Sequence, residues 1–170
     1  AGDQNAAVHL GFWVAGEVLD QSDIPTSGSA SMTGRAVFNV AYRYNQANSD
    51  YGVTQYSTDA DVSASFNWGS GSYSGQLDFA NFDSGNSLVS NAGFTSFSVS
   101  LAGSGATYAG SLNDTNNGWT REAVIAGALY GNNTPVESGG RISVGLSKSG
   151  SLGTSGANDF YMAEGIYLID

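Results

Sequence analysis

The sequence predicts an all-β domain in which eight to ten mainly antiparallel strands form a meander barrel with glycine-rich turns. Apolar and polar residues alternate with a period of two in several segments, most clearly at residues 59–68. Short runs of glycine, serine and asparagine separate these segments, as expected for tight connections between neighbouring strands. No segment longer than about two turns has the 3.6-residue period of an amphipathic helix.

Length, charge and composition indicate one exported domain spanning residues 1–170. Fifteen acidic and five basic residues give a formal net charge of −10, which argues against nucleic acid or an anionic membrane surface as a partner. The chain has no cysteine, so thiol catalysis and disulfides are excluded. No apolar run reaches the roughly 20 residues of a membrane-spanning helix. Low charge and abundant serine, threonine and asparagine favour an extracellular or outer-cell-surface location in a bacterium.

The first part of the chain contains two predicted strands. Residues 7–16 form the first, and its apolar face carries Val8, Leu10, Phe12 and Val14. Residues 17–29 are polar and contain a proline, which indicates a loop. Residues 31–44 form a long second strand, and the turn-forming residues 45–52 follow it.

The middle of the chain is predicted to form two hairpins. Residues 59–68 and 73–79 flank the short turn Gly69-Ser70-Gly71. Residues 96–101 and 106–112 flank a second turn of the same kind. Each strand alternates between a buried and a solvated face, so each hairpin needs further strands on its edges.

Residues 121–146 are the clearest part of the pattern, with two strands around a turn. The turn contains Gly131, Glu137, Gly139 and Gly140, and we expect these four residues to hold the structure together rather than to recognise a partner. Glu137 is expected to accept hydrogen bonds from backbone groups there. Residues 147–158 are a glycine- and serine-rich loop, and residues 160–169 form the last strand.

The alternation also predicts the core, which consists of Phe66, Trp68, Leu77, Phe79, Phe97, Val99, Leu101, Ile125, Ile142 and Val144. A closed barrel is favoured because closure removes the exposed strand edges that this lysine-poor chain does not otherwise protect. A β-sandwich is the alternative, since alternation alone does not distinguish the two.

Several segments resemble the eight-stranded barrel domain of the transferrin-binding protein B type, which is found in surface lipoproteins and secreted haemophores of Gram-negative bacteria. The segments are Ser27-Gly28-Ser29-Ala30 with Gly34-Arg35-Ala36, Ser63-Ala64-Ser65-Phe66-Asn67 with Ser74-Gly75-Gln76-Leu77, Ala106-Thr107-Tyr108-Ala109-Gly110-Ser111-Leu112, and Gly127-Ala128-Leu129-Tyr130-Gly131 with Val136-Glu137-Ser138-Gly139-Gly140. The resemblance covers residues 26–144 and implies a barrel with an exported binding or assembly role. It does not imply transferrin binding, because the chain has no room for the handle domain of the full receptors.

Three residues are candidates for ligand binding. His9 is the only histidine, and two interpretations are open. It is either a half-exposed strand residue beside Trp13 or a haem ligand, since some haemophores that resemble this family bind haem through histidine. No other cofactor is expected. Asn117 and Trp119 lie in a polar stretch, where an exposed tryptophan would bind a carbohydrate or a protein surface. The alternative is a tryptophan folded back over the barrel mouth.

The acidic residues do not form a recognisable metal or catalytic motif. Asp20 with Asp23, Asp59 with Asp61, and Asp83 offer oxygen ligands for calcium, but none has the spacing of a calcium-binding loop, and turns or strand caps account for them. A glycosidase needs two paired carboxylates, and nothing brings together any two of Glu122, Glu137 and Glu164.

Three classes of function follow. The first is a non-enzymatic exported barrel that binds a host or environmental protein or small ligand. The second is a structural subunit of a filament or surface assembly, in which copies are joined by a donated terminal strand, since residues 7–16 and 160–169 are apolar strands at the two ends. An enzyme is the least favoured class, because no nucleophile, base or metal motif is present.

Overall fold

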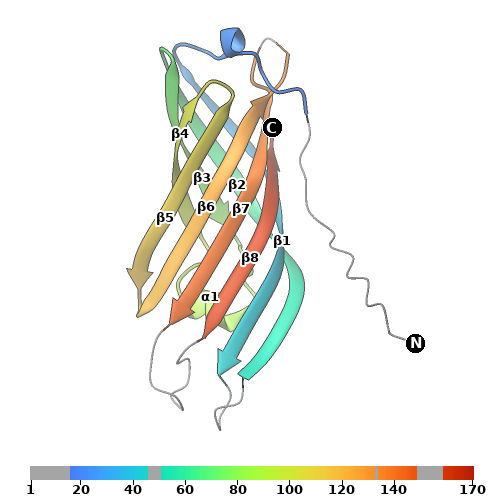
Figure 1. Ribbon diagram of the computed structural model, residues 1–170, viewed down its shortest axis with the longest axis vertical. Helices are drawn as coiled ribbons and strands as arrows, with labels where there is room; N and C mark the ends of the chain where they lie inside the picture. The colour runs from blue at the N-terminus through green and yellow to red at the C-terminus, as the bar shows by residue number, and fades with distance from the viewer. Residues whose placement is uncertain (1–15, 46–50, 133, 149–158) are drawn as a thin grey trace, which may run out of the picture.

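The computed structural model describes residues 16–45, 51–132, 134–148 and 159–170. Eight strands close into an antiparallel meander barrel in which each strand pairs with its neighbours in sequence and β8 pairs with β1 (Figure 1). The strands are β1 Ser29–Asn45, β2 Tyr51–Gly69, β3 Ser72–Ala80, β4 Phe97–Ser104, β5 Thr107–Asn116, β6 Trp119–Tyr130, β7 Glu137–Lys148 and β8 Phe160–Ile169. The barrel is therefore confirmed over the sandwich.

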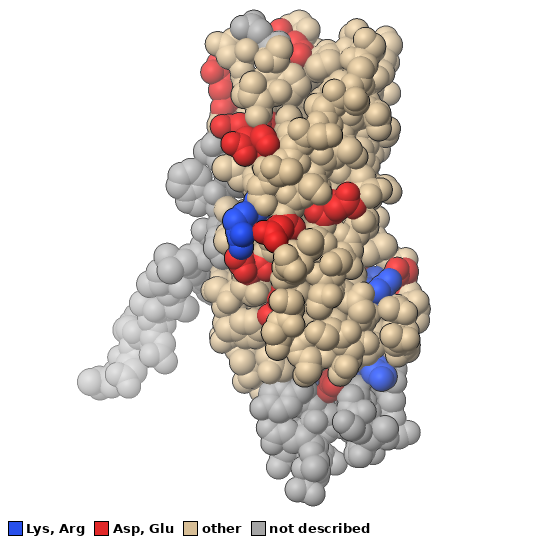
Figure 2. Space-filling view, turned by 180° about the vertical axis from the view of Figure 1, so that it is seen from behind, with Lys and Arg blue, Asp and Glu red and all other residues tan. Residues whose placement is uncertain are grey.

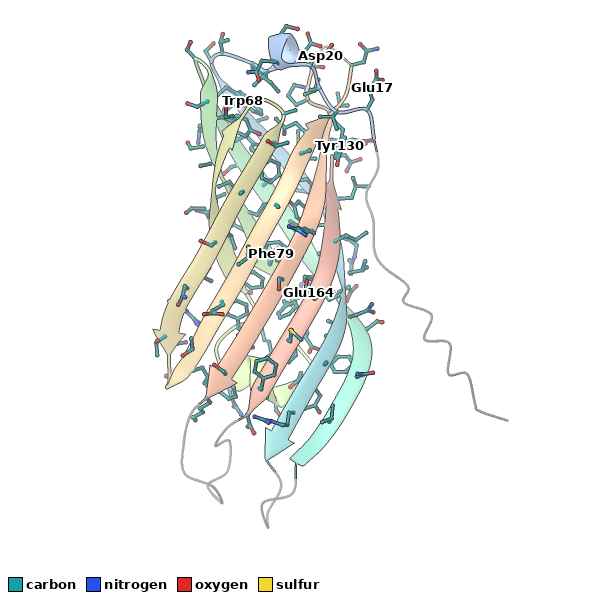
Figure 3. All side chains as sticks on the ribbon, in the orientation of Figure 1. Glu17, Asp20, Trp68, Phe79, Tyr130 and Glu164 are labelled. Carbon is teal, nitrogen blue, oxygen red and sulfur yellow. The ribbon has the colours of Figure 1, made fainter. Side chains whose placement is uncertain are left out.

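The interior is filled by side chains that alternate inward along each strand, as Figure 3 shows for Phe79 near the middle of the barrel. Nine of the ten predicted core residues are buried, including Phe66, Phe97 and Ile125. The tenth, Trp68, is half buried near the upper end, where its ring stacks on Phe66 with the centroids 5.5 Å apart. The period of two thus identified the inner face correctly.

Some strand boundaries differ from the expectation. β2 begins at Tyr51, so it includes residues 53–58, which were left unassigned, and also Tyr51 and Gly52, which were expected in the turn at residues 45–52. The predicted first strand, residues 7–16, lies outside the described residues except for Gly16, which is not in a strand. Barrel closure needs only the eight later strands.

The upper end of the barrel, as seen in Figure 1, is covered by the chain segment that precedes β1. This segment contains the short helix η1, Gln21–Asp23, within the predicted loop. Leu19 is 4% exposed, and its backbone N–H donates to the carbonyl of Leu129 over 3.2 Å. In the described part of the chain, no helix is long and apolar enough to cross a membrane.

Candidate functional site

The lower end of the barrel is closed by the chain between β3 and β4, residues 81–96, which we call the plug. It contains the short helix α1, Ser87–Asn91, whose first turn is capped by Asn86 through a 2.9 Å hydrogen bond from the backbone N–H of Leu88. Its apolar side chains enter the barrel, and those buried are Phe82, Leu88, Val89, Ala92 and Phe94. The plug therefore extends the core to the mouth.

One side of the plug is anchored to β2 and β8 by a buried carboxylate. Asp83 is 8% exposed, and its Oδ2 accepts hydrogen bonds from the hydroxyls of Tyr56 and, over 2.9 Å, Tyr161. The amide of Asn86 donates to the Tyr56 hydroxyl over 2.7 Å. Each polar group in this cluster has a hydrogen-bond partner, which is what a buried carboxylate requires.

The backbone is bent sharply where it delivers Asp83 to the mouth. Asn81 and Asp83 have φ angles of 58° and 41°, in the left-handed region that asparagine and aspartate tolerate better than other non-glycine residues. The surrounding contacts must hold this conformation, since it is disfavoured on its own. The carboxylate is thus fixed in position by the fold.

The other side of the plug is anchored by Arg121, whose side chain points into the lower mouth from β6. Its Nε and Nη2 atoms donate to the two carboxylate oxygens of Asp114 over 2.6 and 2.5 Å. Its Nη1 donates to the carbonyl of Gly93 over 2.9 Å, and its guanidinium carbon lies 5.6 Å from the centroid of the Phe94 ring. The hydrogen bonds from Arg121 lower the pKa of Asp114, so the two residues form a paired anchor at this side of the plug.

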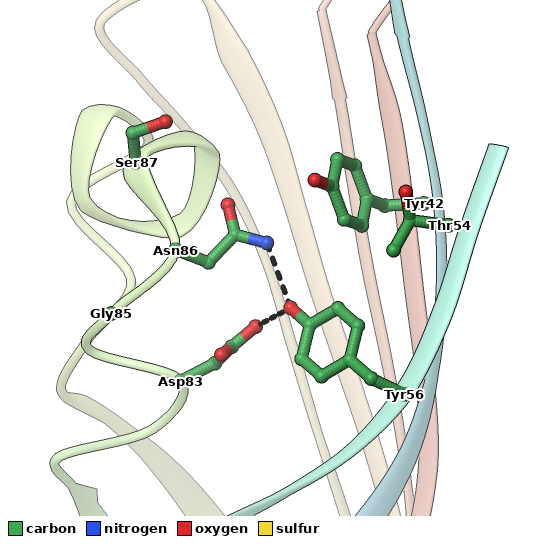
Figure 4. A pocket seen from close by; sticks show the side chains of 7 residues that line it. All are labelled: Tyr42, Thr54, Tyr56, Asp83, Gly85, Asn86 and Ser87. Carbon is green, nitrogen blue, oxygen red and sulfur yellow. Dashed lines mark hydrogen bonds between the residues drawn. The ribbon is translucent and has the colours of Figure 1, made fainter. Parts of the chain in front are cut away.

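Between the plug and the extended ends of β1 and β2 lies an open hollow of about 440 Å³ (Figure 4). The residues that line it are Tyr42, Thr54, Tyr56, Asp83, Gly85, Asn86 and Ser87. Tyr42 forms an aromatic wall, edge-on to Tyr56 at 6.0 Å and stacked on Tyr161 at 6.5 Å between centroids. A carboxylate held between tyrosines beside a concave space is typical of a small-ligand site.

Burial controls the protonation of the tyrosines around the hollow. It raises the pKa of Tyr56, with the hydrogen bond to Asp83 acting in the same direction. Burial and the charge of Asp83 also raise the pKa of Tyr161. Both hydroxyls therefore stay protonated at neutral pH and act as hydrogen-bond donors to the carboxylate.

A second polar network lies nearer the upper end and has a structural role. The Tyr167 hydroxyl donates to that of Tyr108 over 2.8 Å, Tyr108 donates to Ser138 over 2.5 Å, and Ser138 donates to the carbonyl of Ala128 over 3.0 Å. The chain of hydrogen bonds satisfies three side chains inside the barrel and ties β5, β7 and β8 together.

The structure places Trp119 and Asn117 differently from the expected polar loop. Asn117 and Gly118 have φ angles of 51° and 78°, which is the geometry of a two-residue hairpin turn between β5 and β6. Trp119 therefore begins β6 and is only 3% exposed, with Lys148 Nζ 5.6 Å from its ring centroid. Its ring is buried at the lower end of the barrel, which agrees with the alternative of a tryptophan folded over the barrel mouth and not with an exposed tryptophan that binds a partner. His9, the candidate haem ligand, lies outside the described residues.

The predicted structural turn is shorter than expected, because β7 already begins at Glu137. Gly131 remains in the turn with φ 146°, whereas Gly139 and Gly140 lie within the strand, and neither has a positive φ. A Cβ atom on Gly140 would lie 2.2 Å from the carbonyl oxygen of Ala126, so this glycine permits close backbone approach. Glu137 is exposed, and within the described residues its carboxylate has no hydrogen-bond partner, contrary to the role expected for it.

The other acidic candidates lie apart. Asp59 and Asp61 both pair with Arg35 on the outer surface, and Asp23 belongs to η1. Glu122 and Glu164 are exposed, and they accept hydrogen bonds from Asn113 and Ser143. Across the described ranges, no three metal-ligating side chains come together.

Sequence reasoning missed the site formed by Tyr56, Asp83 and Asn86. A signal was present, because Asn86 lies two residues before the apolar pair Leu88 and Val89, as a helix N-cap residue does. The contact between Asp83 and Tyr161 spans 78 residues and follows only from barrel closure.

Comparisons with known proteins do not assign the chain to a family. No protein-family model matches it, and no curated protein is significantly similar to it.

Proposed function

We propose that this chain is a non-enzymatic, exported bacterial binding module that takes a host or environmental ligand at the lower mouth of its barrel. The observation that carries the proposal is the hollow beside Asp83, where a buried carboxylate and aromatic rings are held in place by both the plug and the barrel wall. Such preorganisation reduces the entropy that a ligand would lose on binding.

The resemblance to the barrel of transferrin-binding protein B-type surface proteins supports an exported role. It rests on short glycine-based motifs, one of which includes Gly127 and Gly140. In the barrel these two glycines lie opposite each other on β6 and β7, beneath the Tyr167 hydroxyl. Close packing therefore explains why the motif has glycines at these two positions, and the binding role needs a separate test.

The test is a ligand screen by backbone amide NMR on the full chain. We expect hits to shift the signals of Thr54, Asn86 and Ser87, and Tyr56→Phe to weaken them because it removes a hydroxyl that orients Asp83. Val53→Ala on the same strand is the control, since Val53 is 69% exposed on the outer face. Hits that leave the lower mouth unshifted would contradict the proposal. So would turnover that is lost in His9→Ala or Glu137→Gln with the fold retained.

A second candidate function is assembly of copies through a terminal strand. One observation favours it, because the β4–β5 ladder has four residue pairs, ending at Leu101 and Gly110, and the next six residues of β5 have no β4 partner. These six residues of β5 would form the edge that accepts the donated strand. The donor would come from residues 7–16, since β8 is paired along its length with both β7 and β1.

Light scattering after size-exclusion chromatography separates the two functions. A stable monomer supports the binding module. Filaments or ladders that disappear when residues 1–15 are deleted would support strand donation instead.

A further inference from the structure

We infer that the hollow beside Asp83 binds its ligand through a cationic group, an alkylammonium or a guanidinium, which deepens the proposed binding function and rests on it. Of the seven described residues that line the hollow, Asp83 is the only one that carries a charge. The residue is only 8% exposed, so the fold removes most of its surface from solvent. A carboxylate in such a place favours a positive partner.

The Asp83 carboxylate contributes acceptor oxygens to the hollow, beside the hydroxyls of Thr54 and Ser87, which can donate or accept. The hydroxyls of Tyr56 and Tyr161 both donate to Oδ2 of Asp83, so both bonds use the same carboxylate oxygen. Asn86 uses its amide nitrogen on Tyr56 and its oxygen on the backbone N–H of Leu88. A ligand that brings N–H donors therefore matches the acceptor oxygens of the Asp83 carboxylate.

The walls of the hollow suit a cation as well. Tyr42 and Tyr56 meet edge-on with ring centroids 6.0 Å apart, and both line the space into which Asp83 faces (Figure 4). A cation over a tyrosine face is attracted to the ring electrons, and the attraction is stronger in desolvated sites. Carboxylate and rings together would therefore favour an ammonium or guanidinium over a neutral group of the same size.

The basic residues at this end of the barrel lie on other surfaces than the hollow. Arg43 follows Tyr42 on β1 and lies on the opposite, exposed face of the strand. Arg121 lies on the other side of the plug, where it is committed to Asp114 and Gly93. The formal net charge of −10 adds a negative field, and Figure 2 shows acidic side chains outnumbering basic ones on one face of the barrel. Such a field raises the association rate of cations.

Matched small probes test the inference. We would titrate the full chain with n-butylammonium and n-butylguanidinium, and with 1-butanol and methyl β-glucoside as neutral probes, while following the amide signals of Thr54, Asn86 and Ser87. The variants are Asp83→Asn, which removes the charge at nearly constant shape, and Asp114→Asn as the matched control, because Asp114 also sits at the plug but is paired with Arg121. Thermal melts confirm that each variant is folded, and Tyr42→Leu replaces Asp83→Asn if the latter does not fold.

We expect both cations to bind, and Asp83→Asn or Tyr42→Leu to weaken them about tenfold or more while Asp114→Asn does not. Neutral probes that shift the same signals equally well, or cation binding unchanged in the folded pocket variants, would overturn the inference and leave the binding function standing. If none of the four probes shifts these signals while the ligand screen gives hits there, only the inference is wrong. If neither gives shifts there, both are wrong.

Discussion

The hydroxyl of Tyr161, on the last strand, donates a 2.9 Å hydrogen bond to the carboxylate of Asp83, which lies in the plug 78 residues earlier. This bond joins the end of the chain to a segment that contributes no strand to the barrel. Arg121 holds the opposite side of the plug through the carbonyl of Gly93. The plug is thus tied to the wall on two sides, and the hollow lies along one of them.

The Arg121 anchor predicts a loss of stability when its charge is removed. Arg121→Met would leave the Asp114 carboxylate and the Gly93 carbonyl without their donor, in a place where the arginine side chain is only 16% exposed. We expect a loss of about 1.5 to 3 kcal/mol in the free energy of unfolding, measured by denaturant titration. Amide hydrogen exchange should also increase in α1.

Arg35→Met is the matched control for Arg121→Met. Arg35 likewise pairs with two aspartates, Asp59 and Asp61, but its side chain is 62% exposed. Exposed ion pairs contribute about 0 to 1 kcal/mol, so this variant should change stability little. Equal losses in the two arginine variants would show that the plug anchor contributes no more than a surface ion pair.

The interior of the barrel predicts a large effect at Phe66. Its side chain is fully buried and packs against the rings of Trp68, Tyr73 and Tyr108. Phe66→Ala should cost about 3 to 5 kcal/mol in the free energy of unfolding, because truncation leaves a cavity among these rings. Val53→Ala on the same strand should change it by less than about 0.5 kcal/mol. A small loss for Phe66→Ala would mean that the interior relaxes around the cavity.

The barrel could be predicted from the sequence because its strands follow a strict period of two. Phe66, Leu77 and Val99 could be assigned to the inner face from local pattern alone, and closure was favoured because this lysine-poor chain does not otherwise protect exposed strand edges. Trp119 was predicted to lie in a polar loop, but it begins β6. The turn before it consists of only two residues, Asn117 and Gly118, and the polar sequence around them does not show where the strand resumes.

The candidate site could not be predicted in the same way. Asp83 has no apolar or polar period around it, and its partners Tyr56 and Tyr161 lie on strands that meet it only after the barrel closes. Hydrogen bonds between residues so distant in the chain depend on register and curvature, which local sequence does not determine.

Close packing between β6 and β7 predicts that Gly140 is intolerant of a side chain. A Cβ atom there would lie 2.2 Å from the Ala126 oxygen and 2.8 Å from the Tyr167 hydroxyl. Gly140→Ala should lower the free energy of unfolding by about 1 to 3 kcal/mol through overpacking. On the same strand, Gly145→Ala is the control, since its nearest neighbour would be Glu122 at 3.8 Å. Equal melting temperatures for the two variants would refute this account of the glycine.

Buried tyrosines predict that stability falls at alkaline pH. In five of the nine tyrosines, burial is the main cause of a raised pKa. These five are Tyr56, Tyr73, Tyr108, Tyr161 and Tyr167. A pKa that is higher in the folded state than in the unfolded state contributes stability that is complete below the ordinary tyrosine value of 10.0. That stability is lost as the pH rises above this value, because the unfolded state then releases protons that the folded state retains.

We therefore expect the tyrosinate absorbance of these five residues to appear only together with loss of the β-sheet circular dichroism signal, at a pH above 10.0. The denaturant-unfolded chain is the control, and its nine tyrosines should titrate together near the ordinary value. Tyr161→Phe should remove one tyrosine from the delayed group, and it also removes the bond to Asp83. Full tyrosine ionisation near pH 10.0 with the sheet signal unchanged would mean that water reaches the hydroxyls inside the folded barrel.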